Sequence, residues 1–380
     1  MKFNIKKSDL IEACSQATTF SEKRGDASVI LASVLLCARD AVLEYTAGDR
    51  TVTLRGSVTA AVEQSGEVAV DAGYLSAAVK NMPGDVVAVV VSGKDKGLVR
   101  VELSSGSSSY KLVGQAAADY PVYTSDKTSK VVTVSAGDLS RLLDQSLFAV
   151  ASDDNRYGLN GTHLEVADTQ LRVVATDGNR LQWSQCAFDG ELGVGKKHLV
   201  PRRAWSAIQK LVAALDETAS VTIAFGERSV LVSGGAWKVR SLLLEADFPD
   251  YKQVIPSTFK RSAVVDRAAL QTALRRVMLF ASDNSHTFKF QLVDADLTGG
   301  TRVILTSRKV DAGEAREEVP VELTGDVLAT GFNVKFLQDA LGAFVGEKVT
   351  MQFGDALAPC VIIDSVAANV LSVVMPLRLE

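Results

Sequence analysis

The chain has 380 residues, of which 47% are hydrophobic and 23% are charged, and its formal net charge is −4. This length exceeds one ordinary core and fits two or three domains, and the longest apolar runs are too short to cross a bilayer. The charge excludes a protein that coats nucleic acid with its whole surface, but it allows one that gathers basic residues on one surface. The N-terminus alternates like a strand and has no apolar signal region, so we expect a cytoplasmic protein without a membrane partner.

Three segments at a repeat of roughly 130 residues begin with the same order of elements, a short alternating strand and then a helix. The strands are predicted near residues 3–5, 132–134 and 263–265. Each helix is indicated by apolar or small residues at i, i+3, i+4 and i+7. These positions are Leu10, Ala13, Cys14 and Ala17, then Leu139, Leu142, Leu143 and Ser146, then Leu270, Ala273, Leu274 and Val277.

A second helix is predicted in the back half of each segment. The first covers about residues 72–82. The second begins around Pro201, because proline suits the first position of a helix. The third follows Asn333, a residue type that caps helix N-termini. The remainder alternates between strand and turn, so each segment is predicted as an α+β unit with antiparallel sheets and two helices.

Three prolines mark the ends of these units. Ala118-Asp119-Tyr120-Pro121 recurs as Ala246-Asp247-Phe248-Pro249, and Pro376 lies in the apolar C-terminal segment. Polar stretches at 124–130 and 257–261 resemble interdomain linkers. We therefore expect domains at residues 1–123, 131–256 and 261–380, called the first, central and last thirds below.

The search for catalytic chemistry gives little. The three histidines have no metal-site spacing, and the glycines and lysines of 190–197 resemble a phosphate-binding loop only superficially, since Lys197 replaces the Ser/Thr that would hold magnesium. Asp153 and Asp154 are adjacent and would point apart on a strand. The four separate cysteines are expected to be buried and reduced. No catalytic residue, metal or cofactor is predicted, although an enzyme such as a hydrolase using Asp153 or Asp177 remains the competing hypothesis.

The basic residues are more informative. Several lie on the predicted helices away from the apolar stripe, where a solvated helix face would explain any one of them. Taken together, equivalent helices of three units could present a surface that attracts a phosphate backbone without reading bases. The residues are Lys80, Arg141, Arg202, Arg203, Lys210, Arg275, Arg276 and Lys335.

Five short motifs, in order and on three similar units, make the chain resemble the bacterial sliding clamps, the β subunits of DNA polymerase III. They lie at residues 155–161, 175–181, 248–251, 331–334 and 373–379. The resemblance implies three clamp-fold domains per chain and a head-to-tail homodimer closed as a ring around duplex DNA. It further implies a non-catalytic processivity subunit that tethers the replicative polymerase, the clamp loader and other proteins with clamp-binding motifs.

The resemblance also implies site residues. The partner-peptide cleft would involve Leu159, Thr176, Gly178, Arg180, Leu181, Pro249, Val254, Val374, Met375, Pro376, Leu377 and Arg378. Residues facing DNA would be Arg24, Lys80, Arg141, Tyr157, Arg202, Arg203, Lys210, Arg275 and Arg276. The dimer interface would include Tyr110, Leu112, Leu279 and Phe280.

The chain departs from the family pattern at several positions. Gln253 replaces a basic residue, and Gly158 stands where an aromatic residue commonly follows the tyrosine. The segment 28–33 keeps only the apolar part of a first-domain motif, and Glu380 extends the usual ending.

Overall fold

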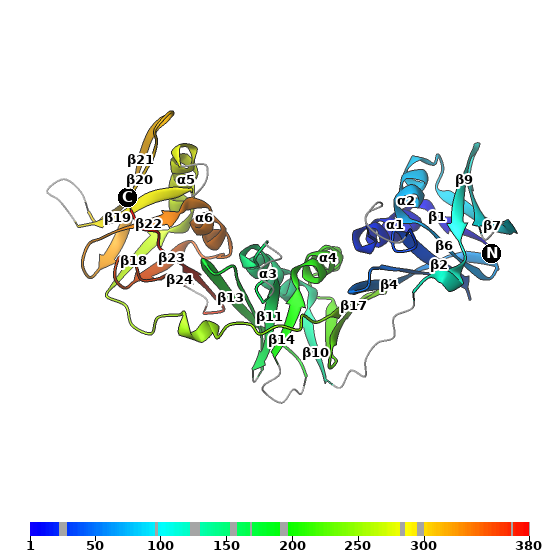
Figure 1. Ribbon diagram of the computed structural model, residues 1–380, viewed down its shortest axis with the longest axis horizontal. Coiled ribbons are helices and arrows are strands. Elements are labelled where there is room, and N and C mark those ends of the chain that lie inside the picture. Colours follow the sequence, from blue (N-terminus) through cyan, green and yellow to red (C-terminus); the bar gives the residue numbers. More distant parts are fainter. Residues whose placement is uncertain are drawn as a thin grey trace. The chain divides into compact units, whose positions relative to one another are not determined.

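The computed structural model describes residues 1–22, 29–95, 98–121, 130–152, 158–167, 169–190, 197–281, 286–294, 300–365 and 368–379 (Figure 1). The chain divides into two compact units. The first unit comprises residues 1–139, 189–192 and 203–243, and the second comprises 140–188, 193–202 and 244–380. The central third therefore contributes residues to both units. The predicted α+β class with antiparallel sheets is confirmed in each unit.

The first unit contains one 13-stranded sheet in the order β10-β15-β16-β17-β4-β3-β2-β6-β9-β8-β7-β1-β5. The central and first thirds meet where β17 pairs antiparallel with β4, from Trp237↔Gly56 to Ser241↔Val52. The strands are β1 Lys2–Lys6, β2 Ser33–Arg39, β3 Val42–Gly48, β4 Val52–Thr59, β5 Ala61–Gln64, β6 Gly66–Asp71, β7 Val86–Asp95, β8 Leu98–Ser105, β9 Ser108–Gln115, β10 Lys130–Ser135, β15 Ser220–Phe225, β16 Ser229–Gly234 and β17 Trp237–Leu242.

Gly56 in β4 shows why one strand residue lacks a side chain. A Cβ there would lie 2.2 Å from Cζ of Tyr45 on the neighbouring strand. The Tyr45 ring occupies that space so that its hydroxyl can donate to Oε1 of Gln16, at 2.6 Å. A glycine is therefore needed for the helix–sheet contact of the first third.

Two helices cover the first third, α1 (Lys7–Phe20) and α2 (Ala72–Asn81). The predicted apolar stripe of α1 is confirmed, because Leu10, Ala13, Cys14 and Ala17 are all buried. Helix α2 begins at an Asp71 cap whose carboxylate accepts a hydrogen bond from the Tyr74 backbone at 2.8 Å, which satisfies one free N–H of the first turn. A short 3-10 turn, η1 (Ala117–Asp119), follows β9.

The second unit contains one 12-stranded sheet in the order β14-β11-β12-β13-β25-β24-β23-β18-β21-β20-β19-β22. The central and last thirds meet where β13 pairs with β25, from Arg180↔Val374 to Ser184↔Val370. The strands are β11 Gly161–Ala167, β12 Gln170–Thr176, β13 Arg180–Ala187, β14 Lys197–Pro201, β18 Arg261–Asp266, β19 Thr287–Val293, β20 Arg302–Lys309, β21 Gly313–Thr324, β22 Leu328–Asn333, β23 Lys348–Phe353, β24 Cys360–Asp364 and β25 Val370–Val374.

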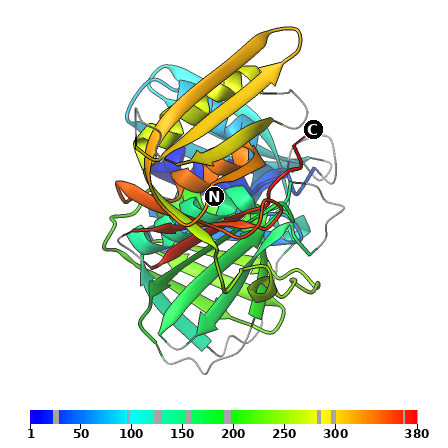
Figure 2. The same ribbon diagram turned by 90° about the vertical axis from the view of Figure 1, so that its left-hand side faces the viewer.

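The other helices are α3 (Ala136–Ser146), α4 (Arg202–Val212), α5 (Arg267–Val277) and α6 (Val334–Gly342), so each third carries the two predicted helices. Short 3-10 turns are η2 (Leu147–Ala149), η3 (Tyr251–Gln253) and η4 (Met278–Phe280). Both helices of the last third pack on its apolar core. Figure 2 shows the β20–β21 hairpin (orange) projecting beside α5.

Pro201 differs from its predicted place. It ends strand β14, and helix α4 begins one residue later. Strand β14 is the outermost strand of its sheet, where a residue without an N–H is tolerated. The Asn333 cap is confirmed, since its side chain accepts from the Lys335 and Phe336 backbones at 2.9 and 3.2 Å.

The cysteine prediction holds for three residues of four. Cys14, Cys186 and Cys360 are buried and free of disulfides, whereas Cys37 is only half-buried. Its neighbours Leu36 and Ala38 point into the core of the first third, so Cys37 must face the other side of β2. None of the helices in the described residues is long and apolar enough to cross a membrane.

Candidate functional site

A tight turn between β12 and β13 forms one end of the candidate site. The Thr176 hydroxyl donates to the Arg180 carbonyl oxygen at 2.6 Å and accepts from the Gly178 backbone at 3.1 Å. Gly178 has a φ of +88°, which a residue without Cβ adopts freely. The Asp177 carboxylate accepts from the Asn179 and Arg180 backbones at 3.0 and 3.1 Å, a local arrangement that aspartate favours in turns.

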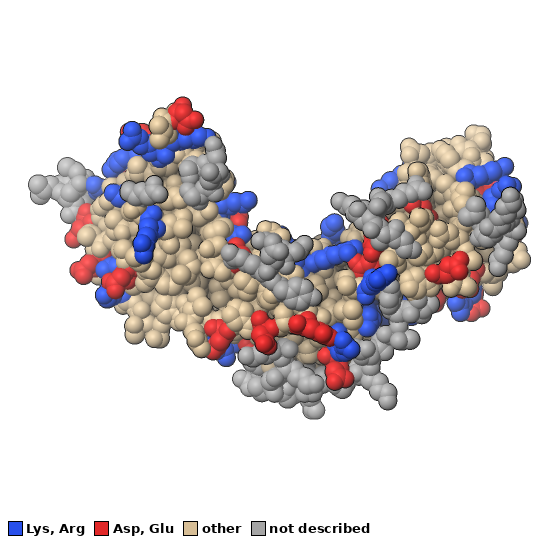
Figure 3. All heavy atoms as spheres, in the orientation of Figure 1, with Lys and Arg blue, Asp and Glu red and all other residues tan. Residues whose placement is uncertain are grey.

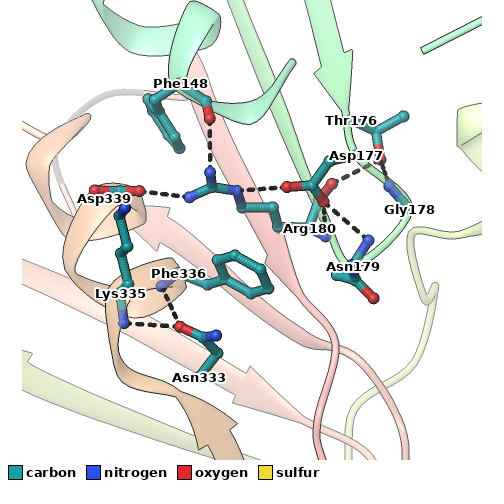
Figure 4. Close-up of polar contacts among 10 residues, drawn as sticks. All are labelled: Phe148, Thr176, Asp177, Gly178, Asn179, Arg180, Asn333, Lys335, Phe336 and Asp339. Carbon is teal, nitrogen blue, oxygen red and sulfur yellow. Dashed lines mark hydrogen bonds and ion pairs between the residues drawn. The ribbon is translucent and has the colours of Figure 1, made fainter. Parts of the chain in front are cut away.

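The Arg180 guanidinium leaves this turn and joins three other groups (Figure 4). Its Nε donates to Asp177 at 3.0 Å, one Nη donates to Asp339 of α6 at 2.6 Å, and the other donates to the Phe148 carbonyl oxygen at 2.7 Å. The Phe336 and Phe148 rings lie 4.5 and 5.3 Å from its central carbon. Three segments of the second unit, the turn 176–180, α6 and η2, thus meet at one cation, which is typical of the planar guanidinium.

The C-terminal segment crosses from this turn to the last third. After β25, the Met375 N–H donates to the Asn179 carbonyl oxygen at 2.9 Å, and the Leu377 N–H donates to Gly331 of β22 at 2.8 Å. Met375, Pro376 and Leu377 are half-buried. The segment therefore has its backbone fixed at two points while its apolar side chains keep part of their surface exposed.

The segment around residues 246–256 lies against the same sheet. The Phe248 ring stacks on His163 with centroids 5.0 Å apart, and the Tyr251 hydroxyl donates to Glu165 at 2.8 Å. Tyr251 belongs to a buried cluster with Leu181 and residues of β12, β24 and β25. This packing anchors the segment, while Pro249 and Val254 stay exposed.

The Glu165 carboxylate is the charged centre of this anchor. Burial raises its pKa, but the Tyr251 hydroxyl and the cations Lys252 and Arg172 outweigh burial and hold the pKa below its ordinary value of 4.5. A lowered folded-state pKa gives stability that is present above the unfolded-state pKa and lost as pH falls through the folded one.

We predict that Glu165→Gln lowers the free energy of unfolding by about 1–2 kcal/mol at pH 7, because a charge-assisted hydrogen bond is lost. The difference from the wild type should shrink as pH falls below about 4.5. Denaturant titrations at pH 7 and pH 4 measure this. Glu322→Gln, which removes an exposed pair with Lys348, should cost little at either pH. A Glu165→Gln cost that grows in acid would contradict the assignment.

The structure brings most of the predicted cleft residues into this region. Thr176, Gly178 and Arg180 share the turn, Val374 pairs with Arg180, and Met375 follows. Thr176, Leu181 and Val374 are buried; Leu159, Arg180, Met375, Pro376 and Leu377 are half-buried; and Gly178, Pro249, Val254 and Arg378 are exposed.

Sequence reasoning missed Phe148, Phe336 and Asp339 as members of this site. For Phe336 the sequence pattern predicts only a place in the helix that follows Asn333, and nothing local distinguishes Asp339, which contacts a residue 159 positions away. Gly158 is explained by packing, because a Cβ there would lie 2.8 Å from the Asp247 carbonyl oxygen. Gln253 donates to Asp250 at 3.1 Å.

The predicted basic helix residues differ in their solvent exposure and in whether a carboxylate pairs with them. Lys80, Arg203, Lys210, Arg275 and Arg276 are exposed, and Arg141 and Arg202 are half-buried. Arg203 forms an ion pair with the buried Asp49, and Arg276 pairs with Glu317 at 3.0 Å. Figure 3 shows basic side chains over α4 and over the region of α5 and the β20–β21 hairpin. Arg24 and Tyr157 lie outside the described residues.

The residues assigned to a dimer interface lie on two different units. Tyr110 and Leu112 are on β9, with Tyr110 exposed and Leu112 half-buried. Leu279 is 75% exposed in η4, which is unusually high for a leucine, and Phe280 is half-buried. The Phe280 ring lies next to the start of β21, 3.3 Å from where a Cβ of Gly313 would be.

The enzyme hypothesis receives no support from these contacts. Asp177 is occupied by the turn and by Arg180, and His163 is a buried strand residue. Among the described residues, no three His, Cys, Asp or Glu side chains are grouped so as to hold a metal. Asp153, Asp154 and residues 191–196 lie outside the described part of the chain.

Comparisons with known proteins agree along the whole chain. Residues 1–124, 133–250 and 252–378 match the N-terminal, central and C-terminal domains of the DNA polymerase III beta subunit. The Beta sliding clamps of Caulobacter vibrioides and Pseudomonas aeruginosa are 30% and 31% identical, over 100% of both chains in each case.

Solved structures give the same result. The sliding clamp of Caulobacter crescentus superposes with a TM-score of 0.90 at 29% identity, and the Pseudomonas aeruginosa clamp bound to griselimycin superposes with 0.91 at 28%. Both comparisons cover 100% of this chain and 100% of the other.

Proposed function

Because the chain belongs to the DNA polymerase III beta subunit family, we propose that it is a sliding clamp, a non-catalytic processivity subunit that encircles duplex DNA and tethers the replicative polymerase. Three clamp domains in one chain, matched at residues 1–124, 133–250 and 252–378, are the observation that carries this proposal. We assign the domains to residues 1–123, 131–256 and 261–380, and the site of action to the cytoplasm.

The working form is a head-to-tail homodimer closed as a ring. Strand β9 pairs with β6 only at Gln115 and Gly114, so its residues 108–113 face no other described strand on that side. Strand β21 pairs with β18 only from residue 321 onward. On that side, its residues 313–320 pair with no other described strand. Two open edges at opposite ends of the sequence can pair antiparallel between copies and close a ring.

DNA is held mainly by the closed ring, with weak electrostatic help. Lys80, Lys210 and Arg275 are exposed cations on helices of three domains, whereas the charges of Arg203 and Arg276 are partly offset by their carboxylate partners. Such contacts attract phosphates without reading sequence and weaken with salt. They therefore permit sliding.

Partners attach where the turn 176–180, the C-terminal segment and β22 meet. The half-buried Met375, Pro376 and Leu377 lie between the turn 176–180 and β22. A partly apolar, methionine-containing groove suits short linear segments from several proteins. We assign to it the binding segments of the replicative polymerase, the clamp loader and other clamp-binding proteins.

Negative-stain electron microscopy of the purified protein tests the assembly. We expect rings of two chains with an open central hole. A compact single chain with a closed pocket, at concentrations where the family's rings persist, would contradict the proposal and favour the enzyme hypothesis. In a primer-extension assay, the polymerase should then make longer products when the ring is loaded on the DNA than when it is not.

A further inference from the structure

The Arg180 guanidinium makes most of its hydrogen bonds to groups of its own chain. Three of its N–H groups donate to Asp177, Asp339 and the Phe148 carbonyl oxygen, and two aromatic rings lie within stacking distance of it. The Arg180 and Asp339 side chains are only 11% and 31% exposed. A guanidinium has five N–H groups, so two remain for a ligand, on a side chain that is mostly buried.

These contacts join segments of two different domains. Asp177 and Arg180 belong to the central third, and Asp339 lies on α6 of the last third, as does Phe336. The Phe148 side chain packs against the core of the last third. The ion pair between Arg180 and Asp339 therefore fixes α6 relative to the turn 176–180.

The same turn and helix lie on either side of the C-terminal segment, residues 375–377. Asn179, in the turn, accepts the hydrogen bond from Met375, and Val374 pairs with Arg180. Helix α6 begins directly after β22, whose Gly331 accepts from Leu377. A change in the distance between the turn and α6 must therefore move the half-buried side chains of residues 375–377.

We propose that the Arg180–Asp339 ion pair is an interdomain latch that holds the partner-peptide cleft in its binding-ready shape, and that Arg180 is a positioning residue, not a peptide ligand. The inference rests on the proposed peptide-binding function. Preorganised sites bind more tightly because the ordering cost is already met in the free protein. Opening the latch lowers the fraction of molecules with a competent cleft, and so weakens the apparent affinity by that fraction.

The test uses the full-length dimer and a fluorescein-labelled synthetic peptide carrying the clamp-binding segment of the replicative polymerase. Asp339→Ala removes the acceptor while keeping a good helix former at a partly exposed position. We expect about a tenfold weaker Kd, mostly through slower apparent association, because fewer free molecules then have a competent cleft. Asp339→Asn, which keeps an acceptor oxygen but not the charge, should lie between Asp339→Ala and the wild type.

A double-mutant cycle separates positioning from contact. Arg180→Lys keeps the charge but loses the planar fork, and we expect the double variant Arg180→Lys/Asp339→Ala to bind no worse than the weaker single variant. Glu322→Gln is the matched control, since it breaks an exposed ion pair of the last third and should bind as the wild type does.

The outcomes are distinguishable. Wild-type affinity in Asp339→Ala, or additive losses in the double variant, would overturn the latch while leaving the peptide site intact. Weakening in Arg180→Lys together with wild-type affinity in Asp339→Ala would show that Arg180 contacts the peptide, and would overturn the positioning role. Failure of the wild-type dimer to bind the peptide would overturn the proposed function and the latch with it. Hydrogen exchange at the Asn179 and Arg180 amides should speed up in Asp339→Ala if the latch also orders the turn.

Discussion

Removal of residues 375–380 is expected to abolish binding of the polymerase peptide while leaving the dimer intact. The truncation removes Met375, Pro376 and Leu377, which are half-buried between the turn 176–180 and β22. Full burial of a large apolar side chain is worth about 1.5–3 kcal/mol, so a peptide that completes the burial of half-buried ones gains roughly half of that for each. We therefore expect a loss of at least about a hundredfold in affinity.

A shorter truncation provides the control. Removing residues 379–380 takes away Leu379, which is 40% exposed, and Glu380, which lies outside the described residues, and should change the affinity about threefold or less. Fluorescence anisotropy with the labelled peptide measures both variants, and light scattering confirms the dimer. Unchanged affinity in the longer truncation would show that the C-terminal segment only packs between the two domains and does not bind the peptide.

Leu279→Asp is expected to convert the dimer to monomers. Leu279 is 75% exposed in the single chain, next to Phe280 and the open edge of β21. If the ring closes there, the substitution buries an unpaired carboxylate at both interfaces, at a cost of several kcal/mol each. Sedimentation velocity at micromolar concentration should then show a single chain, and retention on circular DNA should be lost.

Val345→Asp is the matched control for this experiment. Val345 is also 75% exposed and also belongs to the last third, but it follows α6 and is not part of the β21 edge. The variant should remain dimeric. If Leu279→Asp also remains dimeric, the interface lies elsewhere, and Tyr110 and Leu112 would lose their assigned role too.

Local patterns predicted the helices well. The apolar stripes of α1, α3 and α5 are buried, for example Leu10, Leu139 and Leu270, because helical periodicity is a property of neighbouring residues. The Asn333 cap was predictable for the same reason. Pro201 was assigned one residue too far into its helix, since proline suits both a helix start and the end of an outer strand.

Contacts between distant residues could not be predicted from these patterns. The pairing of Arg180 with Val374 and the ion pair of Arg180 with Asp339 join residues of two domains, and no periodicity encodes a partner so far along the chain. The same holds for the carboxylates that offset Arg203 and Arg276. The cleft residues came from the family resemblance, and the latch is visible only in the folded chain.

The central claim is that the ring holds DNA by topology, and linearisation tests it most directly. The dimer is loaded by its clamp loader onto a nicked circular duplex, unbound protein is removed, and the circle is then cut once. We predict that the protein stays on the closed circle at moderate salt and slides off within minutes once free ends exist, while end-blocked linear DNA retains it. Equal retention on the circle and on the unblocked linear molecule would contradict the claim, because it would mean that direct contacts hold the DNA.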